Sequence, residues 1–174
     1  SPSTPSSLLI VAADTLEALG LNLDRAMETA EATLVDLGIC FLFAQKHHPA
    51  LGPIAPIRRA LGRRTIFNYL GPLCNPGAVK RQLVGVPTPE IVPIYAEAIR
   101  LLGSERALVV SGEEGLDEIS VSGPTRVESI GFSSMSDVIT PESAGIAIHP
   151  PEALKGGDAA YNAAALRRLL DGET

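Results

Sequence analysis

The alternation of apolar and polar positions predicts helices and short buried strands along the first quarter of the chain. Asp14 opens a helical pattern that ends at Gly20, and Asp24 caps a longer helix that ends at Gly38. Residues 39–44 then form a continuous apolar run, which is typical of a strand buried on both faces. We therefore expect two helices followed by a strand.

The middle of the chain predicts a strand–helix–strand unit. Residues 82–86 and 107–110 are short apolar runs, and Thr88 followed by Pro89 starts a helix between them. The apolar stripe that indicates this helix consists of Ile91, Ile94, Ala98 and Leu101. Because a helical crossover joins parallel strands, these two strands are expected to pair in parallel.

The last third predicts antiparallel structure and one more helix. Residues 121–127 suggest a hairpin that turns at Gly123-Pro124, and residues 145–148 favour a further strand. Asp158 caps a final helix over residues 159–170.

The predicted fold class is α/β, with a mostly parallel sheet flanked by helices and a C-terminal hairpin. Residues 1–13 are Ser/Pro-rich at their start and are expected to be an irregular or partly disordered leader, followed by a single α/β domain over 14–174.

Composition narrows the class of protein. With 174 residues, 45% of them hydrophobic and 20% charged, the chain has the make-up of one globular domain. The net charge of −6 disfavours nucleic acid and anionic membranes as partners. Cys40 and Cys74 occur without CxxC spacing, which favours free thiols in a reducing, cytoplasmic compartment. The apolar run 8–13 is far shorter than the ~20 residues that span a bilayer.

Two clusters of polar residues are candidates for a binding site. Four arginines fall within seven residues, namely Arg58, Arg59, Arg63 and Arg64. They are either a solvated basic face or a fork for a carboxylate or phosphate, which guanidinium binds through two parallel hydrogen bonds. His47 and His48 follow the predicted strand 39–44 and either line a site or are ordinary loop residues, and a metal role for them is disfavoured.

The acidic pair Asp117-Glu118 lies on a glycine-flanked loop that follows the predicted strand 107–110. Mg²⁺ in proteins takes oxygen ligands, often one or two carboxylates together with waters and substrate phosphates. Adjacent acids are common, so the spacing alone leaves open whether the pair is a magnesium site or a solvated acidic turn.

The order of several motifs resembles anthranilate phosphoribosyltransferase over roughly residues 14–171. The matching runs are residues 38–50, Arg64-Thr65-Ile66-Phe67-Asn68, Gly71-Pro72-Leu73 with Asn75-Pro76, Arg81-Gln82-Leu83-Val84-Gly85-Val86, Gly115-Leu116-Asp117-Glu118, and Lys155-Gly156-Gly157-Asp158 with Asn162-Ala163. That family transfers a phosphoribosyl group from phosphoribosyl pyrophosphate to anthranilate and releases pyrophosphate, in tryptophan biosynthesis. The resemblance implies that Arg64 contacts the anthranilate carboxylate and that Asp117 and Glu118 bind Mg²⁺. It also implies a homodimer for the full-length family, while the state of this chain stays open.

The chain also departs from the family pattern. The family has an upstream helical domain and a Gly-Thr-Gly-Gly-Asp phosphate loop, neither of which occurs in the printed sequence. Where the family carries a polar serine- and lysine-containing run, residues 8–13 are apolar. We therefore expect a partial catalytic domain with an incomplete phosphoribosyl pyrophosphate pocket that is inactive by itself.

Two other functions remain as alternatives. A degenerate, non-catalytic paralogue or assembly partner would also explain the apolar run at residues 8–13. A pyrimidine-nucleoside phosphorylase shares the general fold, but Arg64 in its Thr-Ile-Phe-Asn context and the Asp117-Glu118 pair argue against it.

Overall fold

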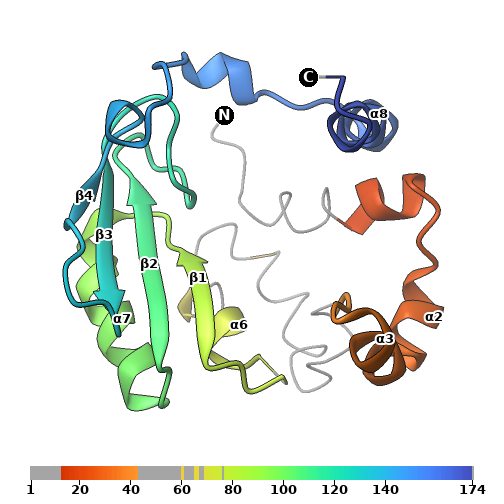
Figure 1. The fold of residues 1–174 in the computed structure, drawn as a ribbon, viewed down its shortest axis with the longest axis horizontal. Helices are drawn as coiled ribbons and strands as arrows, with labels where there is room; N and C mark the ends of the chain where they lie inside the picture. The colour runs from red at the N-terminus through yellow and green to blue at the C-terminus, as the bar shows by residue number, and fades with distance from the viewer. Residues whose placement is uncertain (1–12, 43–59, 61–64, 67–68, 76, 174) are drawn as a thin grey trace. The chain divides into compact units, whose positions relative to one another are not determined.

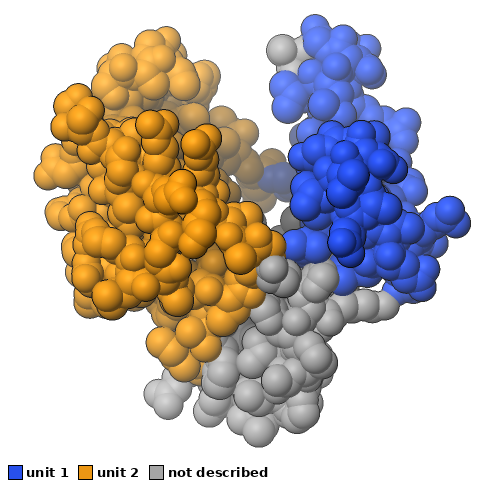
Figure 2. Space-filling model, turned by 60° about the horizontal axis from the view of Figure 1, so that its bottom comes forward, with its two compact units in different colours: residues 1–64, 156–174 blue, residues 65–155 orange. Residues whose placement is uncertain are grey.

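A computed structural model describes residues 13–42, 60, 65–66, 69–75 and 77–173 (Figure 1). The chain divides into two compact units, which Figure 2 draws in different colours. One unit contains Thr65–Lys155, and the other contains Ser1–Arg64 with Gly156–Thr174.

The unit Thr65–Lys155 is built on a four-stranded mixed sheet. Its strands are β1 (Arg81–Gly85), β2 (Arg106–Gly112), β3 (Thr125–Ile130) and β4 (Val138–Ile139), in the order β1-β2-β3-β4. β1 and β2 pair in parallel, whereas β3 runs antiparallel to both of its neighbours. The α/β fold class is confirmed, as is the parallel pairing predicted from the strand–helix–strand pattern. The sheet is mixed rather than mostly parallel, because two of its three pairings are antiparallel.

The helix between the two parallel strands covers one face of this sheet (Figure 1). It starts as the 3₁₀ turn η3 (Pro89–Ile91) and continues as α7 (Val92–Leu101). Pro93 lies in the first turn of α7, where a missing N–H breaks no intrahelical hydrogen bond. The core under α7 consists of Val84, Val86, Val92, Tyr95, Ala96, Ile99, Ala107, Val109 and Ile130.

Two short helical elements also belong to this unit. Helix α6 (Leu70–Leu73) precedes β1, and the 3₁₀ turn η5 (Pro151–Leu154) lies near the end of the unit. Leu73 and the neighbouring Tyr69 are partly buried and pack against the core under α7. The segment before β1 therefore contributes to the same core as the sheet.

The predicted apolar stripe of α7 is only partly the buried one: Ile91 packs against the core, but two of the other members do not. Ile94 and Leu101 are 73% and 79% exposed, while the buried side chains are Val92, Tyr95, Ala96 and Ile99. The helix carries apolar residues on two neighbouring stripes, and both satisfy the helical period. Packing against the sheet, rather than periodicity, decides which stripe is buried.

The hairpin predicted over residues 121–127 is also wrong in its pairing. β3 begins at Thr125, and its partners are β2 on one side and β4 on the other. No strand precedes the Gly123-Pro124 turn to pair with β3. The amides of Ser122 and Gly123 donate to the Ser120 hydroxyl instead of to a neighbouring strand. The C-terminal part of the sheet is therefore antiparallel, but it is built from different strands.

Two further stretches predicted as strands from their apolar runs show no strand structure where they are described. Residues 39–42 have no strand structure, and residues 43–44 of that run lie outside the described residues. Residues 145–148 follow the short 3₁₀ turn η4 (Glu142–Ala144), and Ile146 N–H donates to the carbonyl of Pro141. That hydrogen bond, with Gly145 at φ 73°, commits the backbone to a turn.

The second unit is helical where it is described. Residues 13–18 are helical, which confirms the first predicted helix, while residues 1–12 of the predicted leader lie outside the described part. The long helix expected from Asp24 is instead two helices, α2 (Leu23–Glu28) and α3 (Ala30–Leu37). The Asn22 side chain, rather than that of Asp24, caps α2 by accepting from the Arg25 amide at 2.9 Å.

The break between α2 and α3 has a local cause. The Thr29 hydroxyl donates to the carbonyl of Arg25 at 2.9 Å, and the Thr29 backbone leaves helical geometry at φ −106° and ψ 9°. Threonine hydroxyls that bond back to the preceding turn bend helices. The predicted end of α3 is confirmed, since Gly38 adopts the left-handed conformation at φ 75°.

The last helix, α8 (Ala159–Leu170), matches its prediction at both ends. The Asp158 side chain accepts from the Tyr161 amide at 2.8 Å, as expected of an N-cap. Cys40 and Cys74 are free thiols, as predicted. Among the helices in the described ranges, none is long and apolar enough to cross a membrane.

Candidate metal-binding loop

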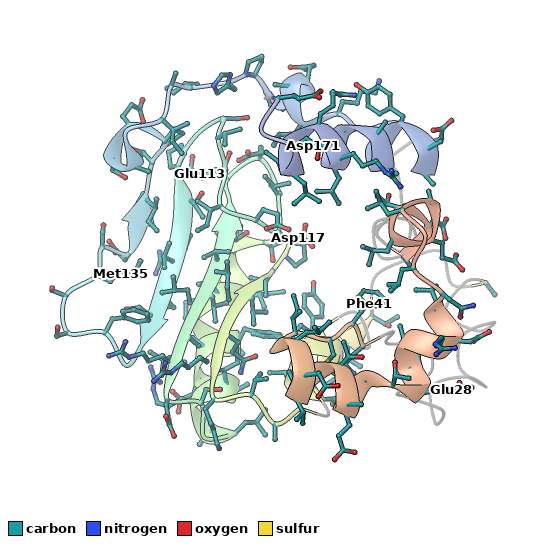
Figure 3. The ribbon with its side chains drawn as sticks, turned by 45° about the vertical axis from the view of Figure 1, so that its right-hand side comes forward. Glu28, Phe41, Glu113, Asp117, Met135 and Asp171 are labelled. Carbon is teal, nitrogen blue, oxygen red and sulfur yellow. The ribbon has the colours of Figure 1, made fainter. Side chains whose placement is uncertain are left out.

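The candidate site is the loop of residues 113–124, here called the acidic loop, which follows β2. Figure 3 labels two of its residues, Glu113 and Asp117, near the carboxyl ends of β1 and β2. The Gly115 amide donates to the carbonyl of Gly112 at 3.0 Å, and the Gly112 amide donates to the carbonyl of Leu116 at 2.8 Å. Gly115 has φ +87°, a conformation that favours glycine, so the turn depends on this residue. These contacts turn the chain back toward the sheet just before the acidic pair.

The two predicted magnesium ligands, Asp117 and Glu118, lie on this loop and are both exposed to solvent. Partial burial raises the pKa of the Glu118 carboxyl, and the neighbouring charge of Asp117 raises it further. A raised pKa means that the folded loop disfavours the second negative charge. A cation bound between the two carboxylates would relieve this penalty.

The backbone of Asp117 lies directly against Gly85 at the end of β1. A Cβ atom added to Gly85 would lie 1.6 Å from the Asp117 carbonyl oxygen and 2.4 Å from its carbonyl carbon. A side chain at residue 85 is therefore incompatible with this position of the acidic loop. The second metal candidate, Glu118, comes next along the chain.

A second anchor holds the far end of the acidic loop. The Ser120 amide donates to the Thr125 hydroxyl at 2.9 Å, and Thr125 is fully buried at the start of β3. The Ser120 hydroxyl donates to the Glu114 carboxylate, which ties the loop to itself. The acidic pair thus lies between an anchor at Gly85 and an anchor at Thr125.

The donor set of the acidic loop suits Mg²⁺ better than a closed structural metal site. Within the described ranges no group of three or more His, Cys, Asp or Glu side chains gathers around a common point. A structural zinc site requires four such ligands. Mg²⁺ takes one or two protein carboxylates and completes its coordination with water and phosphate oxygens. Asp117 and Glu118 fit that second pattern.

The other predicted site residues are not part of this geometry. Arg64, the predicted anthranilate ligand, lies outside the described residues, as do Arg58, Arg59, Arg63, His47 and His48. The segment just after Arg64 is partly described, and the Tyr95 hydroxyl donates to the Tyr69 carbonyl at 2.6 Å. Burial raises the pKa of the Tyr95 hydroxyl, with the Cys74 thiol adding to the effect. Tyr95 therefore keeps its proton and ties Tyr69 to α7.

The sequence reasoning missed the residues that support the loop. Gly85 interrupts the apolar run 82–86, and a glycine inside a strand often marks a close backbone approach. That signal was present in the sequence. Thr125 gave no comparable signal, because its hydroxyl partner depends on how the loop folds onto β3.

Comparison with known proteins places the chain in a family. The family model described as "Glycosyl transferase family, a/b domain" matches residues 9–174. The chain belongs to this glycosyl transferase family.

Several relatives of this glycosyl transferase chain are anthranilate phosphoribosyltransferases. The one from Novosphingobium aromaticivorans is 62% identical over 164 residues, which is 93% of this chain and 49% of the relative. The one from Erythrobacter litoralis is 55% identical over 162 residues, covering 92% of this chain and 49% of the relative. The chain thus spans about half the length of the curated relatives that it matches.

Solved structures agree with the fold. The anthranilate phosphoribosyltransferase from Thermus thermophilus matches with a TM-score of 0.81 at 46% identity, over 93% of this chain and 48% of that one. The enzyme from Saccharomyces cerevisiae in complex with PRPP and Mg matches with a TM-score of 0.84 at 32% identity, over 94% of this chain and 46% of that one. The resemblance inferred from the motifs is confirmed.

Proposed function

We propose that this chain serves, as part of an anthranilate phosphoribosyltransferase, in the transfer of a phosphoribosyl group from phosphoribosyl pyrophosphate to anthranilate. The bond from the ribose C1′ to the pyrophosphate oxygen breaks, a bond from C1′ to the anthranilate nitrogen forms, and the amine loses a proton. The observation that carries the proposal is the 62% identity to the Novosphingobium enzyme, together with an acidic pair on an anchored loop.

In this proposal Asp117 and Glu118 hold magnesium through their carboxylate oxygens. Magnesium held there would offset the negative charge that builds on the departing pyrophosphate. The yeast structure in complex with PRPP and Mg supports the use of both ligands in this family.

Arg64 is the proposed ligand of the anthranilate carboxylate. A guanidinium binds a carboxylate through two parallel hydrogen bonds, so it fixes the orientation of the acceptor as well as its position. Arg64 then contributes by holding the amine near C1′ and takes no proton itself.

A hybrid enzyme tests the transfer reaction. Residues 14–174 of this chain replace the matching stretch of the Novosphingobium relative, which supplies the remaining half. We expect the hybrid to release pyrophosphate in a manner that depends on anthranilate and on magnesium. A folded hybrid without this activity would support the alternative that the chain is a non-catalytic paralogue or assembly partner.

The role of Arg64 is tested in the same hybrid. We expect Arg64→Ala to raise the KM for anthranilate by about tenfold or more, since a charge-assisted pair is worth roughly 1.5–3 kcal/mol. Arg64→Lys should restore little of the affinity, because an ammonium lacks the planar fork. Arg63→Ala is the matched control in the same arginine cluster and should leave the KM unchanged. An unchanged KM in Arg64→Ala would remove Arg64 from the site.

Three further properties belong to this proposal. Residues 14–174 are proposed to act as one α/β domain, in a protein that pairs as a homodimer. The two free thiols, Cys40 and Cys74, support a reducing compartment, so we place the reaction in the cytoplasm.

A further inference from the structure

The position of the acidic loop depends on contacts made by residues that carry no charge. At one end, the Asp117 carbonyl oxygen occupies the space where a side chain of Gly85 would begin, 1.6 Å from the added Cβ. Real Cβ atoms are not found closer than 3.0 Å to such an atom. Any side chain at residue 85 must therefore displace the backbone of Asp117.

At the other end, Thr125 supplies the acceptor for the Ser120 amide at 2.9 Å. Thr125 is 0% exposed and pairs with Gly112 across the β2–β3 ladder, so its hydroxyl has a fixed position on the sheet. Ser120 lies two residues beyond Glu118. Removal of the hydroxyl would leave the buried Ser120 amide without this acceptor.

We propose that Gly85 and Thr125 are positioning residues that set the metal affinity of the Asp117-Glu118 pair. Gly85 lets the acidic loop lie directly on the end of β1, and Thr125 holds the return of the loop at the start of β3. Neither residue is proposed as a ligand of the metal. This inference rests on the proposed function, because it takes Asp117 and Glu118 to be the magnesium ligands.

The arrangement has a physical reason. Two adjacent carboxylates on a free loop would turn away from each other, because their charges repel and the exposed backbone is mobile. Fixing the backbone on both sides of the pair lowers the entropy that must be lost when a cation binds. Groups that orient metal ligands typically account for 10- to 100-fold in metal affinity.

Manganese binding to this chain, followed by NMR, tests the inference without relying on enzyme activity. Mn²⁺ replaces Mg²⁺ at carboxylate sites and broadens the amide signals of nearby residues. In the unmodified chain we expect broadening centred on Asp117 and Glu118. Gly85→Ala and Thr125→Val should each raise the Mn²⁺ concentration needed for half-maximal broadening by about 10- to 100-fold.

Two matched controls separate positioning from general damage. Gly123→Ala adds the same methyl group to the acidic loop, at a place where a new Cβ meets nothing within 4 Å. Thr125→Ser keeps the hydroxyl that accepts from Ser120 while losing the methyl group. Both variants should titrate like the unmodified chain. Should Gly85→Ala lose its dispersed spectrum, the comparison of Thr125→Val with Thr125→Ser decides the test.

The outcomes are distinct. If Gly85→Ala and Thr125→Val bind Mn²⁺ as tightly as the unmodified chain, the positioning role is wrong. If the unmodified chain itself shows no broadening near Asp117, the magnesium role in the proposed function is what fails.

Discussion

At the scale of single residues, the raised pKa of Glu118 links the proposed site to the stability of the fold. Its carboxyl has a raised pKa, first because it is partly buried and second because Asp117 is next to it. Burial without a partner and a like charge both penalise the ionised form. In the absence of metal, Glu118 therefore destabilises the fold when it is charged.

The pH dependence of stability follows from that shift. The folded-state pKa of the Glu118 carboxyl lies above its unfolded value of about 4.3. The contribution of the protonated carboxyl to the free energy of unfolding is therefore fully present below the unfolded pKa and is lost as the pH rises through the folded pKa. We expect Glu118→Gln, which cannot ionise, to be more stable than the unmodified chain at neutral pH, with the difference shrinking in acid. Urea unfolding from about pH 4 to 7 measures this difference. Added magnesium should reduce the stability difference between Glu118→Gln and the unmodified chain at neutral pH. A stability difference that does not change with pH would contradict the raised pKa of Glu118.

At the scale of elements, α7 shows how one helix can carry two apolar stripes. Ile99 is fully buried under the helix, whereas Ile94, on the same helix, is 73% exposed. The two residues have identical side chains, so their contributions to stability differ through their surroundings alone.

This pair gives a direct test of which face of α7 is buried. Ile99→Ala should cost about 2–5 kcal/mol in the free energy of unfolding, since it leaves a cavity against the sheet. Ile94→Ala should cost about 0.5 kcal/mol or less, as is usual for exposed positions. Urea unfolding of both variants, read by circular dichroism, provides the values. Equal losses would mean that the outer stripe is covered too.

The elements also show where local pattern predicts structure and where it does not. Helix α8 was predicted at both ends, because the Asp158 cap is an interaction within four residues of sequence. The expected hairpin at residues 121–127 failed, because β3 finds its partners in β2 and β4. Strand pairing depends on residues distant in sequence, which apolar runs do not specify.

At the scale of the whole molecule, the chain spans about half the length of its curated relatives. The printed sequence has no Gly-Thr-Gly-Gly-Asp run, and residues 8–13 are apolar where a polar run is expected from the family. The printed sequence contains the proposed magnesium ligands Asp117 and Glu118, but no run in it resembles the phosphate-binding loop of the family.

We therefore expect this chain by itself to bind the magnesium complex of phosphoribosyl pyrophosphate weakly or not at all, even though the metal alone can bind at Asp117 and Glu118. Isothermal titration calorimetry of the chain with both ligands measures this. The hybrid with the Novosphingobium relative is the positive control, because the relative supplies the remaining half of the protein. Tight, magnesium-dependent binding to the chain alone would overturn the expectation.

The sequence alone determined the α/β class, the parallel strand–helix–strand unit, the cap of α8 and the acidic pair as a candidate metal site. These features depend on residues close together in sequence, or on motifs shared with a family. Only the tertiary structure decided which stripe of α7 is buried and which strands pair with β3. It also revealed that Asp117 lies against Gly85, while Ser120 bonds to Thr125. Those contacts join residues whose approach depends on how the sheet and the acidic loop pack together.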